Sequence, residues 1–449
     1  MNGGTNASAR AAAVWSPMAA RADGTTRVIQ ASDEGGPMRS LALLLGLSLL
    51  FLRMSMLHQI LDYVTGVPLR LLYIVGIPAL LGVVVAGGIQ RAFRGRPTLY
   101  WVAFVGWLIA GLPFSSWRGG SALWLMNYLR ADFIMLFITA GLVVTWKECR
   151  WLMYTMGWAA AVTVLSSRIF NNALNGRIGL EVGTVKNPDD FAGHLLLVLP
   201  FLLWMALSSK SPVLRVGAIL AAGYGVYVIL ASGSRGAFVA LIAAALFYLV
   251  RGTARQRIAF LATASIAMMV LPALLPQRSL NRLRSVISSS GPVEDTAEST
   301  ASRRYLMDLG IKVAFQHPVF GIGQGQFANY EGINSRVVRG IHGQYQEVHN
   351  SYIAAASECG LPAFFFFVAG VLSSFRLLNS TFRQARLRPE CQDIKTATFC
   401  IMLAMVGFCV CIAFLNFTYF FYLPAMAGIS VAVYNAAQEE FRLRSVDPS

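Results

Sequence analysis

Long apolar stretches separated by short polar segments occupy most of the chain, and this pattern restricts the fold more than any other feature. A helix needs about 20 apolar residues to cross the hydrocarbon core of a membrane. Charged residues make up only 13% of the chain, about half the fraction in a soluble domain. The sequence therefore predicts an all-α polytopic membrane protein with twelve transmembrane helices, at residues 40–57, 69–89, 98–113, 121–145, 150–167, 190–207, 213–232, 236–250, 258–276, 351–375, 396–415 and 417–437.

The positive charge of the chain is concentrated in alternate short loops. Its net charge is +16, which by itself is compatible with nucleic-acid binding. Cytoplasmic loops of membrane proteins, however, carry an excess of Lys and Arg. In a chain of twelve spans the basic loops all fall on one side, with both termini, so we expect cytoplasmic termini and no nucleic-acid partner. These loops contain Arg91, Arg94, Arg96, Lys147, Arg150, Lys210, Arg215, Arg251, Arg255, Arg257 and five residues from Arg376 to Lys395.

The predicted spans divide the chain into five segments. Residues 1–38 are rich in Ala, Gly, Arg and Ser without periodicity, so they are expected to be a disordered cytoplasmic tail. Residues 39–276 hold transmembrane helices 1–9, and residues 351–437 hold helices 10–12. A large, partly helical external loop at 277–350 lies between helices 9 and 10, and residues 438–449 form a second cytoplasmic tail. Within the loop, Arg303 and Arg304 open a helical segment that ends at Pro318.

A short external turn, Ala231 to Gly236, connects two predicted spans and contains an arginine. Its glycines permit an irregular backbone, and Ser234 is a good cap for the helix that follows. Arg235 then lies beside free N–H groups and the positive end of a helix dipole, a combination that favours phosphate. The alternative is an interfacial arginine that extends toward lipid head groups.

His349 stands directly before another predicted helix. Asn350 or Ser351 is a suitable N-cap for that helix, so His349 lies just outside its N-terminus. The helix dipole there disfavours the imidazolium ion and keeps the ring neutral. A neutral imidazole is what a general base requires at pH 7. The alternative is a surface histidine that forms ordinary hydrogen bonds.

The remaining polar candidates in or near the spans are assigned structural roles. Asp189 and Asp190 start a predicted span and are expected to cap its helix, although they are also suited to orienting a sugar hydroxyl. His194 is expected to be a hydrogen-bonded interior residue. Arg130 and Asp132 are two residues apart, so each needs its own partner within the fourth span. No Cys/His group has the spacing of a zinc site, and no metal or cofactor is predicted.

Several of these segments together resemble the O-antigen ligase/polymerase family. Arg303 lies fifteen residues before Pro318, and the resemblance continues through the glycine-rich run 320–327 to His349, Asn350 and Gly360. The turn at 232–236 and the sequence Asn-Pro-Asp-Asp at 187–190 are similar to recurring family segments, in the expected order. The likeness covers roughly residues 180–370. At Ala363 the chain departs from the Gly, Thr or Tyr that the family pattern often has.

The resemblance implies an enzyme of the bacterial inner membrane that uses an undecaprenyl-pyrophosphate-linked glycan at the periplasmic face. In this family His349 would be the general base. Arg235 and one of Arg303 and Arg304 would hold the pyrophosphate, and the spacing to Pro318 favours Arg303. The acceptor would be lipid A core or a growing polysaccharide. Supporting roles would fall to Ser234, Asn350 and Gly360.

The expected function is therefore that of an O-antigen ligase, an inverting glycosyltransferase. No Asp-x-Asp motif occurs in an external loop, and a metal-independent mechanism follows, as the resemblance also implies. A repeat-unit polymerase and a protein O-glycosyltransferase remain alternatives within the same superfamily. A secondary transporter is the alternative from another class. Against it, the sequence has no evident two-half repeat and no series of intramembrane carboxylates for ion coupling.

Overall fold

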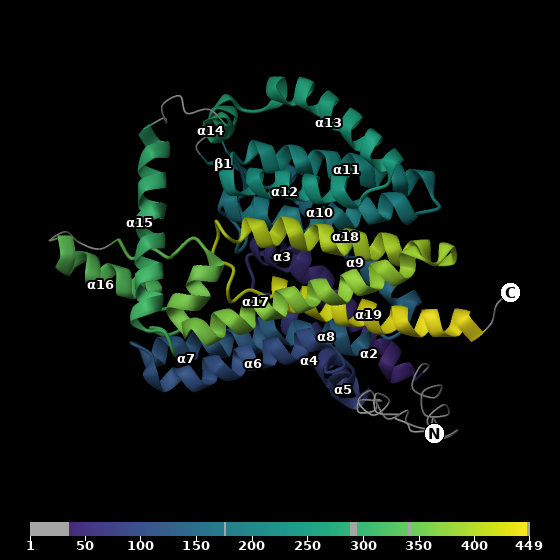
Figure 1. The fold of residues 1–449 in the computed structure, drawn as a ribbon, viewed down its shortest axis with the longest axis horizontal. Helices are drawn as coiled ribbons and strands as arrows, with labels where there is room; N and C mark the ends of the chain where they lie inside the picture. The colour runs from purple at the N-terminus through teal and green to yellow at the C-terminus, as the bar shows by residue number, and fades with distance from the viewer. Residues whose placement is uncertain (1–35, 175–176, 288–293, 340–343, 447–449) are drawn as a thin grey trace, which may run out of the picture.

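Helices that run side by side along the longest axis form the body of the molecule (Figure 1). The computed structural model describes residues 36–174, 177–287, 294–339 and 344–446, so the predicted tail at 1–38 lies almost wholly outside the described residues. The bundle contains α2 (Pro37–Met54), α4 (Leu71–Val85), α6 (Arg96–Gly111), α8 (Ile134–Leu142), α9 (Trp146–Ile169), α10 (Pro188–Ser208), α11 (Pro212–Ala231), α12 (Arg235–Arg251), α17 (Ser351–Arg386), α18 (Gln392–Cys411) and α19 (Tyr422–Val446).

The other elements lie at the ends and edges of this bundle. Helix α15 stands across one end of the bundle, where α16 and α14 also lie, and the C-terminus lies at the opposite end (Figure 1). These elements are α3 (Leu57–Thr65), α5 (Gly88–Ala92), α7 (Arg118–Asn127), α13 (Ala254–Leu274), α14 (Gln277–Ile287), α15 (Glu294–Gln316), α16 (Phe327–Arg339), η1 (Leu112–Phe114), η2 (Tyr128–Phe133), η3 (Pro389–Cys391) and the antiparallel hairpin of β1 (Asn171–Leu174) and β2 (Arg177–Leu180).

The prediction of an all-α polytopic membrane protein is confirmed, apart from the small hairpin. Within the described ranges, eight helices are long and apolar enough to cross a membrane, and each coincides with a predicted span. The other four predicted spans coincide with α4, α9, α12 and α19, which do not meet the same criteria of length and composition. The count of twelve spans therefore stays a prediction.

Two predicted helix boundaries differ from those in the structure. Helix α15 begins at Glu294, nine residues before Arg303, so the two arginines lie inside the helix and do not open it. The last helix begins at Tyr422, later than the predicted residue 417. The segment before it wraps around the start of α17, where the Ser351 hydroxyl donates to the Leu415 carbonyl at 2.8 Å and accepts from the Phe417 N–H at 2.8 Å. This contact fixes the N-terminus of α17.

The polar residues of the fourth predicted span each have a separate partner, as expected. Asp132 forms an ion pair with Arg53 and accepts a hydrogen bond from the Phe421 N–H at 3.2 Å. Arg130 donates to Asn127. Both Arg130 and Asp132 belong to the π-helical turn η2, whose widened backbone is often associated with local side-chain interactions or function. Here the turn connects α7 to α8, and through Asp132 it also contacts Arg53 of α2 and the segment before α19.

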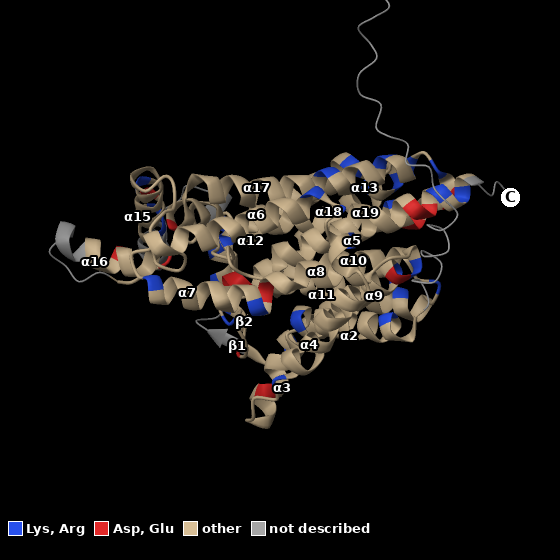
Figure 2. Cartoon of the chain, turned by 90° about the horizontal axis from the view of Figure 1, so that it is seen from below, with Lys and Arg blue, Asp and Glu red and all other residues tan. Residues whose placement is uncertain are grey.

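Charge and burial are unevenly distributed over the bundle. Many Lys and Arg residues lie at the end that carries the C-terminus (Figure 2). Helix α10 is the most enclosed candidate span, with 83% of its apolar window buried. Helix α13, by contrast, has no buried side chain among those described. The apolar surface of α13 is therefore available to lipid.

The glycine run between α15 and α16 packs against a break in α17. Gly321, Gly323 and Gly325 all have positive φ angles, and a Cβ at Gly321 would clash with the backbone of Glu358. The Glu358 carboxylate accepts the N–H of Gly325 at 2.9 Å. The break itself is at Gly360, with φ 86°, where a Cβ would clash with the Val319 carbonyl. These glycines allow close packing against α17, and Gly360 has the same role.

Candidate functional site

The turn between α11 and α12 places Arg235 at a helix N-terminus. The Ser234 hydroxyl accepts the Ala237 N–H at 3.4 Å, which confirms Ser234 as the N-cap of α12. Arg235 is the first residue of that helix and is half-buried. The first turn of a helix has N–H groups without intrahelical acceptors, and it carries the positive end of the dipole. This part of the chain is therefore electrostatically suited to an anion.

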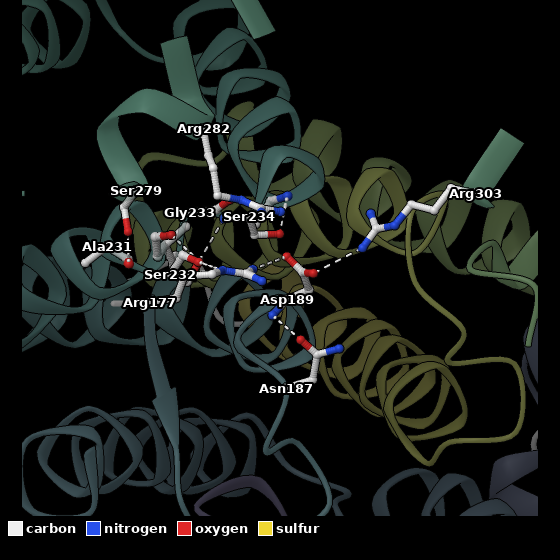
Figure 3. A network of polar contacts seen from close by, with 12 residues as sticks. Arg177, Asn187, Asp189, Ala231, Ser232, Gly233, Ser234, Ser279, Arg282 and Arg303 are labelled. Atoms are coloured by element: carbon white, nitrogen blue, oxygen red, sulfur yellow. Dashed lines mark hydrogen bonds and ion pairs between the residues drawn. The ribbon is translucent and has the colours of Figure 1, made fainter. Parts of the chain in front are cut away.

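Asp189 is the centre of a polar network at this end of the bundle. Its side chain is buried, with 5% of the residue exposed. It accepts hydrogen bonds from Arg177 at 2.7 Å, from Arg303 at 3.1 Å and from the Ser234 hydroxyl (Figure 3). One carboxylate thus connects β2, α15 and the turn before α12 to the start of α10.

The expectation that Asp189 and Asp190 cap α10 is wrong. Asn187 is the N-cap, because its side-chain oxygen accepts the Asp189 N–H at 3.0 Å. Capping by the asparagine leaves the Asp189 carboxylate available for the two arginines. Asp190 is half-buried next to it, and its charge interacts with those of Asp189, Arg303 and Glu347.

Four arginines surround Asp189, and we call Arg177, Arg235, Arg282 and Arg303 the arginine cluster. Each of Arg235 and Arg282 lies close enough to other members of the cluster for their charges to interact. The charge of Asp189 acts on both Arg235 and Arg282. Four guanidinium groups at the N-terminus of a helix are suited to an anion. Guanidinium groups bind phosphate oxygens in a fixed fork geometry.

His349 lies close enough to Arg303 and Asp189 for their charges to act on its ring. Its side chain is exposed, yet the surrounding protein removes part of its hydration and lowers the pKa of the ring. The positive charge of Arg303 lowers this pKa further, and Asp189 opposes the change. In the described part of the chain no protein group forms a hydrogen bond to the ring. The imidazole is therefore neutral at pH 7 and accessible from outside the protein.

Asn350 caps α17, as the sequence predicts for this position. Its side-chain oxygen accepts the N–H groups of Tyr352 at 3.0 Å and Ile353 at 3.1 Å. His349 is consequently held one residue outside the N-terminus of α17. The contacts of Ser351 with the segment before α19 support the same geometry.

The structure brings Arg235, Arg303, Ser234 and His349 to one place but leaves two other predicted site residues outside it. The Arg304 side chain is exposed and, across the described ranges, forms no hydrogen bond or ion pair. This arrangement favours Arg303 over Arg304. Gly360 belongs to the break in α17 and contacts the backbone at Val319, so its contribution is to packing.

Three members of the network were not predicted as site residues. Asp189 was assigned to capping, and no role was predicted for Arg177 or Arg282, which lie in segments predicted to be external. The sequence contains one relevant signal, since Asn187 also satisfies the requirements of a cap and thereby frees Asp189. Nothing in the spacing indicates that Arg177, Arg282 and Arg303 approach the same turn, because their distances along the chain are large and irregular.

Among the described residues, no three His, Cys, Asp or Glu side chains come together in an arrangement that would hold a metal ion. The carboxylates near the site are instead surrounded by arginines. Asp189 is bonded to two of them. Metal independence itself is a question of activity, and it stays a prediction.

Comparison with known proteins identifies the domain that contains most of this site. Residues 218–368 match the family model of O-antigen ligases. The matched region includes Arg235, Arg282, Arg303 and His349, whereas Arg177 and Asp189 precede it. A search of curated proteins finds no match to the chain. The family match supports the resemblance found in the sequence, over residues 218–368 of the chain.

Proposed function

We propose that this protein is an O-antigen ligase that transfers a glycan from an undecaprenyl-pyrophosphate donor to an acceptor hydroxyl at the periplasmic face of the bacterial inner membrane. The observation that carries the proposal is the position of His349 beside the arginine cluster. A transferase of this kind needs a base for the acceptor and positive charge for the departing pyrophosphate. Both are present at one end of a membrane-spanning bundle.

The proposed reaction is a single displacement. His349 takes the proton of the acceptor hydroxyl while the acceptor oxygen attacks the anomeric carbon of the donor. The bond between that carbon and the phosphate oxygen breaks, and its electron pair leaves with undecaprenyl pyrophosphate. Attack from the side opposite the leaving group inverts the anomeric configuration. Arg235 and Arg303 stabilise the negative charge that develops on the pyrophosphate, an electrostatic effect that is often the largest part of catalysis.

Two observations support a phosphate as the ligand of this site. The site combines a helix N-terminus at Arg235 with several guanidinium groups, and both features bind phosphate in other proteins. The position of Arg303 next to His349 would bring a bound phosphate close to the base. The acceptor is proposed to be lipid A core. A growing polysaccharide would make the protein a polymerase of the same family.

A deletion strain tests the proposed acceptor. If the protein is a ligase, lipid A loses its long glycan chains while lipid-linked polymer accumulates. The measurement is gel and mass analysis of lipid A and of the lipid-linked glycans. Accumulation of single repeat units, without polymer, would assign the protein to polymerisation instead.

Reporter fusions are expected to place the arginine cluster outside the cytoplasm. The alternating basic loops predict cytoplasmic signals for fusions at Arg94, Arg255 and Arg386, and an external signal for a fusion at Ser289. Paired phosphatase and fluorescent-protein reporters measure both outcomes in the same strains. A cytoplasmic signal at Ser289 would contradict the proposed location of the reaction.

Transfer is expected to continue in the presence of a chelator. The proposed mechanism uses arginines in place of a divalent ion to stabilise the pyrophosphate. The measurement is in vitro transfer by purified, reconstituted protein before and after treatment with EDTA. Loss of activity with EDTA and recovery on addition of magnesium would overturn the metal-independent mechanism.

A further inference from the structure

Helix α15 packs against the start of α17 through one face, and the middle of that face is a glycine. Leu306, Gly310 and Val313 are buried, whereas Met307 between them is exposed. The buried positions recur every three or four residues, as expected for one face of a helix. Arg303 is half-buried and lies three residues before Leu306, so it continues the same face toward the N-terminus of α15.

Gly310 brings α15 into close contact with the residues on both sides of His349. A Cβ at position 310 would lie 2.6 Å from the Cγ2 of Ile353 and 3.4 Å from that of Val348. Val348 directly precedes His349, and Ile353 lies in the first turn of α17, where its N–H is capped by Asn350. Non-bonded carbon atoms prefer a separation of about 3.5–4.0 Å, so a side chain at position 310 would force the two helices apart by about 1 Å.

The helix itself does not account for a glycine at this position. Gly310 lies in the interior of α15, where glycine is less favourable than alanine because it loses more backbone freedom. The close contact with α17 is what an alanine would remove. The same junction encloses a small apolar cluster, separate from the main core of the bundle, that consists of Leu306, Val313, Ile322, Phe327, Val348 and Ala354.

Polar contacts connect this junction to the candidate site. The Ser302 hydroxyl donates to the side-chain oxygen of Gln346, in the segment before α17, at 2.8 Å. The next residue, Arg303, donates to Asp189 at 3.1 Å (Figure 3). Helix α15 is therefore attached to the segment before α17 and to the start of α17 at two points, Ser302 and Gly310, and Arg303 lies between them in the chain.

We infer that Gly310 is a positioning residue, which sets the distance between the Arg303 guanidinium and the His349 imidazole. The inference rests on the proposed function and deepens it, because these two groups are proposed to act on the donor and on the acceptor. A side chain at position 310 would move α15, and Arg303 with it, away from the start of α17. A displacement of about 1 Å can cost an enzyme about 10²-fold in rate, so the close packing matters for the reaction as well as for the fold.

The test compares Gly310→Ala with Gly223→Ala in the purified full-length protein. Both variants replace a helical glycine by alanine, but a Cβ at Gly223 of α11 would meet no atom within 4 Å. A double variant, Gly310→Ala with Ile353→Ala, removes the Cγ2 atom that the new methyl group would meet. The measurements are the transfer rate as a function of pH, thermal melting, and the pKa of the His349 imidazole by NMR without substrate, its signal assigned by its loss in His349→Ala.

Gly310→Ala is expected to lower the transfer rate about tenfold to a hundredfold and to raise the pKa of His349 toward 6.5. In the unmodified protein, partial burial and the charge of Arg303 lower this pKa, and Asp189 opposes the change. A more distant Arg303 has a weaker effect on the ring, so the decline of the rate should move to higher pH. The control variant should behave like the unmodified protein. The double variant should recover most of the rate and the lowered pKa.

A folded Gly310→Ala protein with an unchanged pKa of His349 would overturn the inference, whatever its transfer rate, because the glycine would then serve packing alone. If the single variant does not fold, Gly310→Val is made together with Ile353→Ala. Its larger side chain should raise the pKa of His349 above that of the first double variant, and an equal pKa would overturn the inference.

The NMR measurement separates this inference from the proposed function, because it needs neither donor nor acceptor. If the pKa of His349 rises in Gly310→Ala while the transfer rate and its pH profile stay unchanged, Gly310 sets the distance as inferred, but His349 is not the base, and the proposed mechanism fails. If the pKa stays unchanged and His349→Ala still abolishes transfer, only the inference fails.

Discussion

Replacement of His349 by alanine is expected to slow glycan transfer by roughly 10²–10⁴-fold, the usual contribution of a general base. Donor binding should remain nearly unchanged, because a base acts on the acceptor proton and does not hold the pyrophosphate. Asn350, which fixes the start of α17, is not altered by the substitution. The measurement is the single-turnover rate and the donor affinity of the reconstituted variant.

A matched control for this variant is His317→Ala. His317 is an exposed histidine near the end of α15, and its ring packs at 6.4 Å from that of Tyr330. Its removal should leave the transfer rate unchanged. If His349→Ala instead abolished donor binding while the protein stayed folded, His349 would be a phosphate ligand and the base would have to be another residue.

The pH dependence of transfer is a second test of the role of His349. A base is active when it is neutral, and partial burial together with Arg303 lowers the pKa of His349 below 6.5. The rate should therefore be near its maximum at pH 7 and should fall only as the pH drops through this lowered pKa. Substitution of Arg303 by glutamine should move the decline to higher pH. A decline centred above pH 6.5 in the unmodified protein would contradict the assignment.

Replacement of Arg235 by alanine is expected to weaken donor binding by about 2–5 kcal/mol, as for removal of one partner of a buried charge pair. Arg235 begins α12, where the N–H groups and its guanidinium are suited to bind the same phosphate. Lysine keeps the charge but loses the fork that pairs two phosphate oxygens. Arg235→Lys should therefore retain partial affinity and activity.

Arg255→Ala is the control for this effect, because Arg255 is an exposed arginine near the other end of α12. Its loss should not change donor affinity. Binding is measured with undecaprenyl pyrophosphate in nanodiscs, alongside thermal melting of each variant. Equal affinities for Arg235→Ala and Arg255→Ala, with both proteins folded, would exclude Arg235 from the binding site.

Much of the architecture can be predicted from the sequence because a membrane imposes simple rules. Spans are set by the length of apolar stretches, and Ser234 and Asn350 are helix caps whose chemistry is local. The packing of the glycine run against Gly360 is also predictable in kind, since only glycine combines a positive φ with so close an approach. Predictions of this type depend on a few neighbouring residues.

The arginine cluster could not be predicted in the same way. Asp189 and Arg303 are 114 residues apart in the chain, and their contact depends on how α15 crosses the end of the bundle. The role of Asp189 was mistaken because Asp189 and Asn187 are both acceptable caps, and only the geometry shows which side chain bonds to the Asp189 N–H. The position of Arg282 in the cluster could not be predicted either. It depends on which face of α14 packs against α11, and spacing alone does not define that face.

The most direct test of the proposed function is transfer by the purified protein in lipid nanodiscs, with an undecaprenyl-pyrophosphate-linked glycan as donor and lipid A core as acceptor. The expected result is a glycosylated acceptor, an equal amount of released undecaprenyl pyrophosphate, and a new glycosidic bond of inverted configuration, measured by mass spectrometry and NMR. The contradictory result would be a folded, donor-binding protein that transfers nothing to lipid A core or to a growing polysaccharide, or that retains the donor configuration.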